Sequence, residues 1–160
     1  MYTDLRRLLA SLDYRFVHVT GGAPSGFGTF DAGAGVRTPL AIVGHMCGLL
    51  DFVREQFEPV VETSASNSTL TPHNTYEASC VRFRDKLRRL DCCLAEGRPF
   101  DPKREGLTIP GLLQGPVSDA LTHVGQLALL RRLAGSPVEG VSYWRVEMPL
   151  PGSSKSQVDD

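Results

Sequence analysis

The stretch that most constrains the fold of this chain runs from residue 115 to 135, GPVSDALTHVGQLALLRRLAG, where apolar residues recur at helical spacing. On a helix, one apolar stripe is formed by Val117, Ala120, Leu121, Val124 and Ala128. Asp119 and His123 are four residues apart beside this stripe, so they share one helix face and can reach one small ion. A polar pair in this position must be hydrogen-bonded, ion-paired or bound to a metal. The stretch therefore predicts a helix over 116–134 that carries a candidate chelating pair.

Three earlier stretches have the same apolar periodicity. They predict helices over about 3–19, 38–58 and 76–96. Thr38 followed by Pro39 is typical of a helix start, and Gly97 of a helix end. The sequence has no convincing strand alternation and no internal repeat, so we predict an all-α fold, an antiparallel four-helix bundle with long connections. The connections at 60–74 and 98–115 are long enough to allow a crossover instead of a simple up-down order.

The length of 160 residues fits one domain, which we place at 1–150. Residues 151–160, PGSSKSQVDD, are predicted to be a disordered tail. Tyr143 and Trp144 precede this tail and are expected to dock over one end of the bundle.

The charge balance excludes some classes of partner. The formal net charge is −1, which gives no overall attraction to nucleic acid or to an anionic membrane. Basic residues cluster over 82–89, and we expect them to form a solvated helix face partnered by acidic residues elsewhere. DNA binding is a less favoured interpretation of the same face. No apolar run approaches the ~20 residues that span a bilayer, and the N-terminus has no signal-peptide pattern. The expected location is the cytoplasm.

The cysteines point in the same direction. No CxxC pair occurs, so neither a zinc ribbon nor a thioredoxin-like site is indicated. We interpret all four as small hydrophobic residues in the helices of a reduced cytosolic protein; they are Cys47, Cys80, Cys92 and Cys93.

His45 is the third candidate ligand. It lies between Ile42 and Leu49 on one face of the predicted second helix, so its imidazole should point towards the core. A lone histidine in such a place is usually a hydrogen-bonded core residue. Together with Asp119 and His123, however, it could place three metal ligands inside one bundle. Three N/O ligands leave coordination positions open, which is typical of a catalytic divalent metal site.

Two segments resemble a known family. RTPLAIVGHMCGLLDFV (37–53) and DALTHVGQLALLRRLAG (119–135) resemble the DinB/YfiT-like superfamily of bacterial four-helix-bundle proteins. Members carry one ligand histidine in the second helix and an H-x-x-x-H pair on the last helix, followed by Gly-Gln. His45 and His123 match two of these histidines, and Gln126 matches the glutamine. Asp119 stands where the first histidine of the pair is expected.

The resemblance implies a site and an activity. His45, Asp119 and His123 would hold a divalent metal ion, Zn, Ni, Mn or Fe, for which aspartate is a competent ligand. Some relatives are metal-dependent transferases or isomerases that use a low-molecular-weight thiol (mycothiol, bacillithiol or glutathione) as co-substrate. We therefore expect a metal-dependent thiol transferase, or a hydrolase, acting on an electrophilic small molecule. Gln126 would orient a bound ligand or a water beside the metal, and a homodimer is expected by analogy.

The alternative is a non-catalytic helical-bundle protein that serves stress response or dimerisation. In that case His45, Asp119 and His123 would form a buried, metal-free hydrogen-bonded network.

Overall fold

The computed structural model describes residues 2–58, 75–151 and 153, and within them every regular element is helical. The long helices are α1 (Thr3–Thr20), α2 (Pro39–Glu55), α3 (Tyr76–Ala95) and α5 (Ser118–Leu133). The shorter elements are η1 (Phe27–Thr29), α4 (Ile109–Leu112), η2 (Leu113–Val117) and η3 (Tyr143–Arg145). The all-α prediction is confirmed for this part of the chain. The expected polar connection at 60–74 and nearly all of the expected tail lie outside the described residues.

No described helix combines the length and the apolar character needed to cross a membrane.

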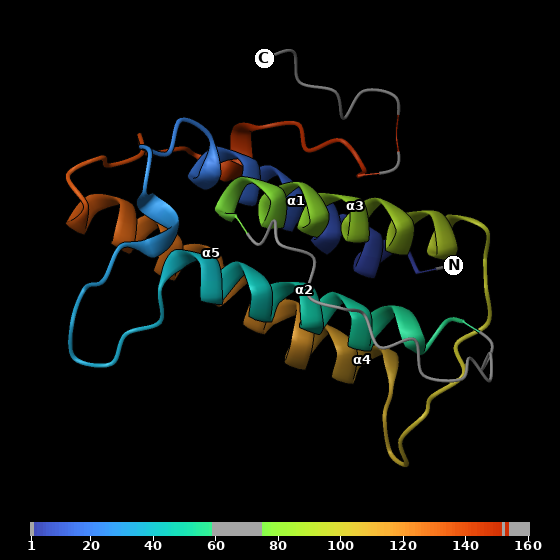
Figure 1. Cartoon of the computed structure of the whole chain (residues 1–160). Helices are drawn as coiled ribbons and strands as arrows, with labels where there is room; N and C mark the ends of the chain where they lie inside the picture. The colour runs from blue at the N-terminus through green and yellow to red at the C-terminus, as the bar shows by residue number, and fades with distance from the viewer. Residues whose placement is uncertain (1, 59–74, 152, 154–160) are drawn as a thin grey trace.

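The four long helices lie in two layers, with α1 and α3 above α2 and α5 in Figure 1. The chain direction is fixed by contacts between helices. Arg6 pairs with Asp91 and Arg84 with Asp13, so α1 and α3 run antiparallel.

α2 and α3 do not run antiparallel to each other, as a simple antiparallel bundle would require. The Cys47 Sγ lies 4.0 Å from the carbonyl oxygen of Ser79, and Asp51 pairs with Lys86 further towards the C-terminal ends of both helices. These contacts show that α2 and α3 run parallel. Such an order is the crossover that the long connection between them allows.

The ends of α2 and α3 follow the capping signals in the sequence. The hydroxyl oxygens of Thr38 and Thr75 accept hydrogen bonds from the backbone N–H groups three residues on, which satisfies a donor that the first helical turn leaves unpaired. Gly97 follows α3 with a φ of 70°, a conformation that glycine adopts at least cost. α2 ends at Glu55, three residues before the expected end, because Gln56 and Phe57 turn tightly and bury their side chains.

The core is formed by the facing stripes of all four long helices. Phe16 of α1 packs against Phe83 of α3 with ring centroids 4.3 Å apart, and both are fully buried. Burying a side chain of this size contributes about 2–3 kcal/mol. Two residues of the apolar stripe predicted for the last helix, Leu121 and Ala128, are only half-buried. On α5 the buried stripe instead continues through Leu127 and Leu130.

The largest departure from the sequence prediction lies before α5. The segment 98–115 was expected to be a loop that ends at a helix start on Pro116. Instead, Thr108 caps a helix that begins at Ile109, and the chain continues without a break through η2 into α5. Pro116 lies inside this helix, where it has no N–H to donate and its ring crowds the preceding turn. η2 is therefore a wider π-helical turn, which makes room for the proline.

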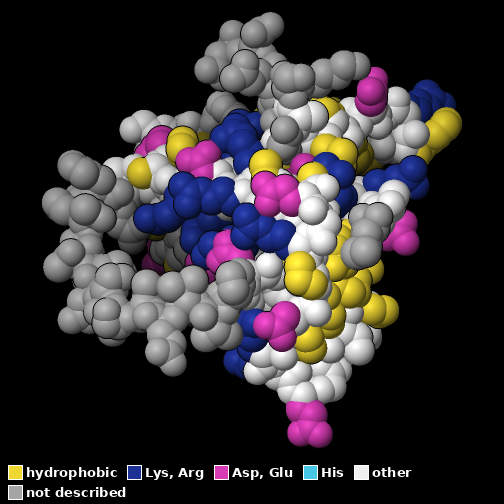
Figure 2. Space-filling view, turned by 90° about the vertical axis from the view of Figure 1, so that its right-hand side faces the viewer, with side chains coloured by type: hydrophobic (Ala, Val, Ile, Leu, Met, Phe, Trp, Pro, Cys, Tyr) yellow, Lys and Arg dark blue, Asp and Glu magenta, His cyan; other side chains and the backbone are white. Residues whose placement is uncertain are grey.

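Three side chains of the basic face of α3 pair with carboxylates, and two of these carboxylates belong to other helices, as predicted. Arg84 pairs with Asp13 of α1 and Lys86 with Asp51 of α2, while Arg88 pairs with Asp85 on its own helix. Figure 2 shows dark-blue and magenta side chains interspersed on one face of the molecule.

The segment after α5 packs against α1 through Tyr143. Its ring makes an edge contact with Tyr14 at 6.3 Å, and the guanidinium of Arg15 lies 3.9 Å from its centroid. The expectation for Trp144 is wrong, because this side chain is 80% exposed.

The four cysteines are free thiols on α2 and α3. Burial raises the pKa of Cys47 and Cys93, and it raises the pKa of Cys80 to about 12. Cys92 is exposed, so it departs from the predicted role of a small core residue.

These thiols should therefore react at different rates. Only the thiolate attacks a disulfide reagent, so a folded sample at pH 8 should show one fast reaction with DTNB, from Cys92. The Cys92→Ser variant should lose the fast phase, and Cys80→Ser should keep it. A fast phase that survives in Cys92→Ser would contradict this assignment.

One buried cation joins the ends of α1 and α5. Arg131 is only 4% exposed. Its side chain donates hydrogen bonds of 2.9–3.1 Å to the carbonyl oxygens of Val19, Gly21 and Gly22. It donates two more to the carbonyl and hydroxyl oxygens of Ser136. All five donors of the guanidinium fork are thereby used without a carboxylate.

Replacing Arg131 by alanine should lower the free energy of unfolding by about 2–4 kcal/mol, because buried carbonyl groups lose their donors. Urea unfolding followed by circular dichroism measures the change. The neighbouring Arg132 is exposed, so Arg132→Ala serves as the control and should change stability by less than about 0.5 kcal/mol. Equal effects of the two substitutions would refute the role of Arg131.

Candidate metal site

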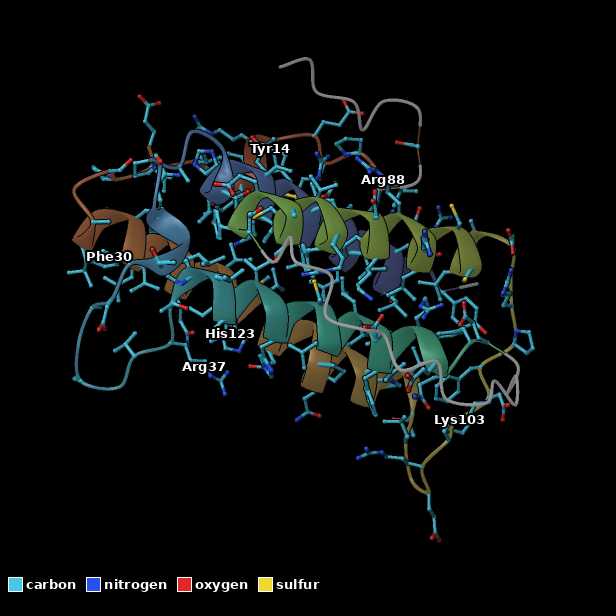
Figure 3. The ribbon with its side chains drawn as sticks, viewed as in Figure 1. Tyr14, Phe30, Arg37, Arg88, Lys103 and His123 are labelled. Atoms are coloured by element: carbon cyan, nitrogen blue, oxygen red, sulfur yellow. The ribbon has the colours of Figure 1, made fainter. Side chains whose placement is uncertain are left out.

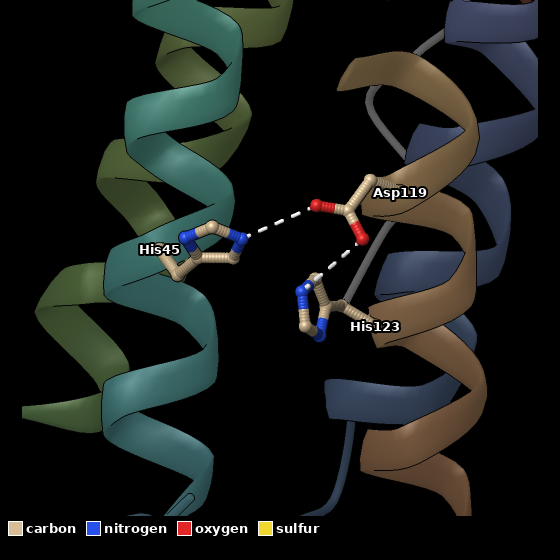
Figure 4. A group of neighbouring side chains, drawn as sticks. All are labelled: His45, Asp119 and His123. Carbon is tan, nitrogen blue, oxygen red and sulfur yellow. Dashed lines mark hydrogen bonds and ion pairs between the residues drawn. The ribbon is translucent and has the colours of Figure 1, made fainter. Parts of the chain in front are cut away.

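His45 lies at the border between the core and the solvent on α2. Ile42 and Met46, on either side of it, are buried, whereas Gly44 is exposed. The His45 side chain is 37% exposed, so the expectation that it points into the core is wrong. Figure 4 shows its ring leaving α2 towards α5.

The π-helical turn sets which residues of α5 face His45. One residue more in a turn rotates every later side chain by about 100° relative to an unbroken α-helix. The carbonyl oxygen of Leu113 accepts a 2.7 Å hydrogen bond from the Ser118 hydroxyl, which satisfies a group at the wider turn. With this rotation, Asp119 and His123 face α2. Figure 3 shows His123 in the layer that α2 and α5 form.

The three predicted ligands come together. Asp119 Oδ2 lies 3.3 Å from His45 Nε2, and Asp119 Oδ1 lies 3.5 Å from His123 Nε2 (Figure 4). The two imidazole rings meet edge to face, with centroids 4.8 Å apart. One ligand atom from each residue can be chosen so that all three lie within 4.8 Å of one another. The carboxylate therefore stands between the two histidines, one oxygen towards each.

The side chains differ in burial. The side chain of His123 is 8% exposed and that of Asp119 is 45% exposed. The site thus has a fixed inner ligand and two outer ligands that border the solvent. This geometry differs from a fully buried network, and it leaves a small molecule free to approach from outside.

Gln126 holds the ring of His123. Its Oε1 lies 2.8 Å from His123 Nδ1, one helical turn further along α5, so Nδ1–H donates to the amide oxygen. This hydrogen bond fixes the tautomer of a neutral imidazole and turns the lone pair of Nε2 towards Asp119. A lone pair facing a carboxylate oxygen at 3.5 Å is repulsive unless a proton or a cation lies between them.

The three donors suit a divalent cation in type and spacing. Metal–ligand distances of 2.0–2.2 Å place neighbouring ligand atoms about 3.0–3.5 Å apart, which matches both histidine–carboxylate distances. All three ligand atoms lie within 4.8 Å of one another, and the His45 side chain is only partly buried. Two imidazoles and one carboxylate are ligands that Zn²⁺, Ni²⁺, Mn²⁺ and Fe²⁺ accept. His45, Asp119 and His123 thus form a group that could hold a metal ion.

Comparison with protein-family models, with curated proteins and with solved structures finds no match to this chain.

Removal of the amide at residue 126 tests its role. Gln126→Ala should weaken binding of Zn²⁺ by about 10–100-fold, because His123 loses the acceptor that orients it. Titration of the apo protein against a chromophoric chelator measures the affinity. Since Gln126 is exposed, the melting temperature of the metal-free variant should not change.

Gln126→Glu is the matched control for that titration, because a carboxylate also accepts from Nδ1–H and should retain the affinity. Equal zinc affinities of Gln126→Ala and the wild type would show that the hydrogen bond does not position His123.

Proposed function

We propose that this chain is a DinB/YfiT-like four-helix bundle in which His45, Asp119 and His123 hold a divalent metal ion. Its activity in this proposal is transfer of a low-molecular-weight thiol to an electrophilic small molecule. The protein works as a homodimer in the cytoplasm, as the resemblance and the composition suggest. The observation that carries the proposal is the convergence of one carboxylate and two imidazoles from facing helices.

Each side chain has a distinct part in this scheme. His123, fixed by Gln126, presents Nε2 from the inner wall of the site. His45 presents Nε2 from the opposite helix, and Asp119 supplies the negative charge between them. A divalent ion with open coordination positions lowers the pKa of a thiol or a water that binds to it. The partial exposure of Asp119 and His45 leaves that side of the site open to a co-substrate.

A second function is supported by the same contacts. A proton on His123 Nε2 would turn its contact with Asp119 into an ion pair, and the three side chains would then form a metal-free network. The protein would in that case be a non-catalytic bundle that serves stress response or dimerisation.

Metal titration separates the two functions. Apo protein titrated with Zn²⁺, Ni²⁺ or Mn²⁺ in a calorimeter should bind one ion per chain, and saturation should raise the melting temperature. His123→Ala should weaken binding by at least 100-fold because it removes one of three ligands. The surface histidine His18, which contacts the carbonyl oxygen of Glu139, is the control, and His18→Ala should bind as the wild type does.

If none of these ions binds above the level of His123→Ala, the metal proposal is wrong and the metal-free network is the better description. Given a bound metal, turnover of the model electrophile 1-chloro-2,4-dinitrobenzene with glutathione, cysteine, mycothiol or bacillithiol then tests thiol transfer. Identical rates for the wild type and His123→Ala with every thiol would remove the transferase assignment.

A further inference from the structure

A depression in the surface begins beside Asp119 and extends along the groove between α2 and η2. It has a volume of about 570 Å³ and is open to the solvent. Its other walls come from Leu49 and Phe52 of α2, from Gln114, Gly115 and Pro116 of η2, and from Ser118 and Thr122 of α5. One of the three candidate metal ligands is therefore part of its wall.

The walls of the depression have an apolar and a polar part. Leu49, Phe52 and Pro116 supply hydrophobic surface. Leu49 and Phe52 follow His45 by four and seven residues, so on α2 they lie on the same face as the histidine. Pro116 lies in the wall because the wider turn keeps it inside the helix. An apolar group extending from the metal position would therefore lie along these three side chains.

A positive charge lies next to Phe52, one of the residues that line the depression. The guanidinium carbon of Arg104 is 5.1 Å from the centroid of the Phe52 ring, stacked as a cation over an aromatic face. Arg104 is exposed, and no carboxylate of the described residues lies within ion-pair distance of it. The neighbouring Lys103 is already paired with Asp101. Arg104 thus has hydrogen-bond donors available to an anionic group above Phe52.

The backbone positions of His45 and Phe52 set the scale of a ligand that reaches from one to the other. Seven residues separate them on a helix that rises 1.5 Å per residue, so they lie about 10 Å apart along α2.

We propose that this depression binds the body of the substrate, an amphipathic carboxylic acid whose reactive group lies at the metal and whose carboxylate pairs with Arg104. This inference rests on the proposed metal site. Phe52, Leu49 and Pro116 contact the apolar middle of the molecule, and Arg104 selects for the negative end. The substrate class is therefore a small acid whose reactive group and carboxylate are joined by an apolar chain long enough to span the roughly 10 Å from His45 to Phe52 along α2.

Three hydroxamic acids test the proposal on the full-length, zinc-loaded protein. Acetohydroxamate carries only the metal-binding group, octanohydroxamate adds an apolar chain, and suberic acid monohydroxamate adds a terminal carboxylate to a chain of the same length. Calorimetry should give the tightest binding for the suberic compound, about tenfold tighter than for octanohydroxamate. Octanohydroxamate should in turn bind more tightly than acetohydroxamate.

Arg104→Gln should abolish the advantage of the suberic compound over octanohydroxamate and leave acetohydroxamate binding unchanged. Because Arg104 is exposed, this substitution should not disturb the fold. Arg132→Gln, a change of the same charge on the exposed side of α5, should retain the advantage.

The possible failures are distinct. If the protein takes up no zinc, the metal site is wrong and the substrate proposal falls with it. If zinc and acetohydroxamate bind but the three compounds have equal affinities, the substrate proposal alone is overturned. A preference for the suberic compound that persists in Arg104→Gln also overturns the assignment of Arg104.

Discussion

Pro116 imposes the constraint on which the candidate site depends. A proline inside a helix cannot donate to the preceding turn, and the chain accommodates it by widening η2 instead of breaking the helix. Leu112 and Val117 on the two sides of the wider turn are both buried, so core packing holds the helix together across it. The rotation that results brings Asp119 and His123 to face α2. The carboxylate and the imidazoles meet because of a backbone irregularity several residues away.

Much of the fold could be predicted from the apolar periodicity. The starts of α2 and α3 are determined by local sequence, namely a threonine hydroxyl and the residues that follow it. Local sequence does not determine the start of the last helix in the same way. Pro39 and Pro116 both suggest the first residue of a helix in the sequence. In the structure Pro39 begins α2, whereas Pro116 lies inside a helix. Thr108, two residues before Pro110, carries the missed start signal. The capping hydrogen bond from the Gly111 N–H to the Thr108 hydroxyl marks the start of the helix, and the burial of Leu112 packs this first turn against the core.

The trio His45, Asp119 and His123 could be selected from spacing and family resemblance, because helical positions four residues apart share a face. Their exposure could not be predicted. The neighbours of His45 in the sequence predict a core residue, but its side chain is 37% exposed. The partner of Gln126 depends on rotamers, which a sequence pattern does not specify. Asp119, where the resemblance expects a histidine, offers two oxygens and so faces both imidazoles at once, which one histidine nitrogen could not do.

The parallel order of the helices has a consequence for the charge of the helix ends. α1 and α5 run in the same direction, so their C-terminal ends lie together, each carrying a partial negative charge from its aligned peptide dipoles. Two like macrodipole ends repel when they are neighbours. The guanidinium of Arg131 is buried between them and donates hydrogen bonds to carbonyl groups in and after the last turn of α1 and after the end of α5. One side chain thus neutralises the electrostatic cost of a topology that brings two C-termini together.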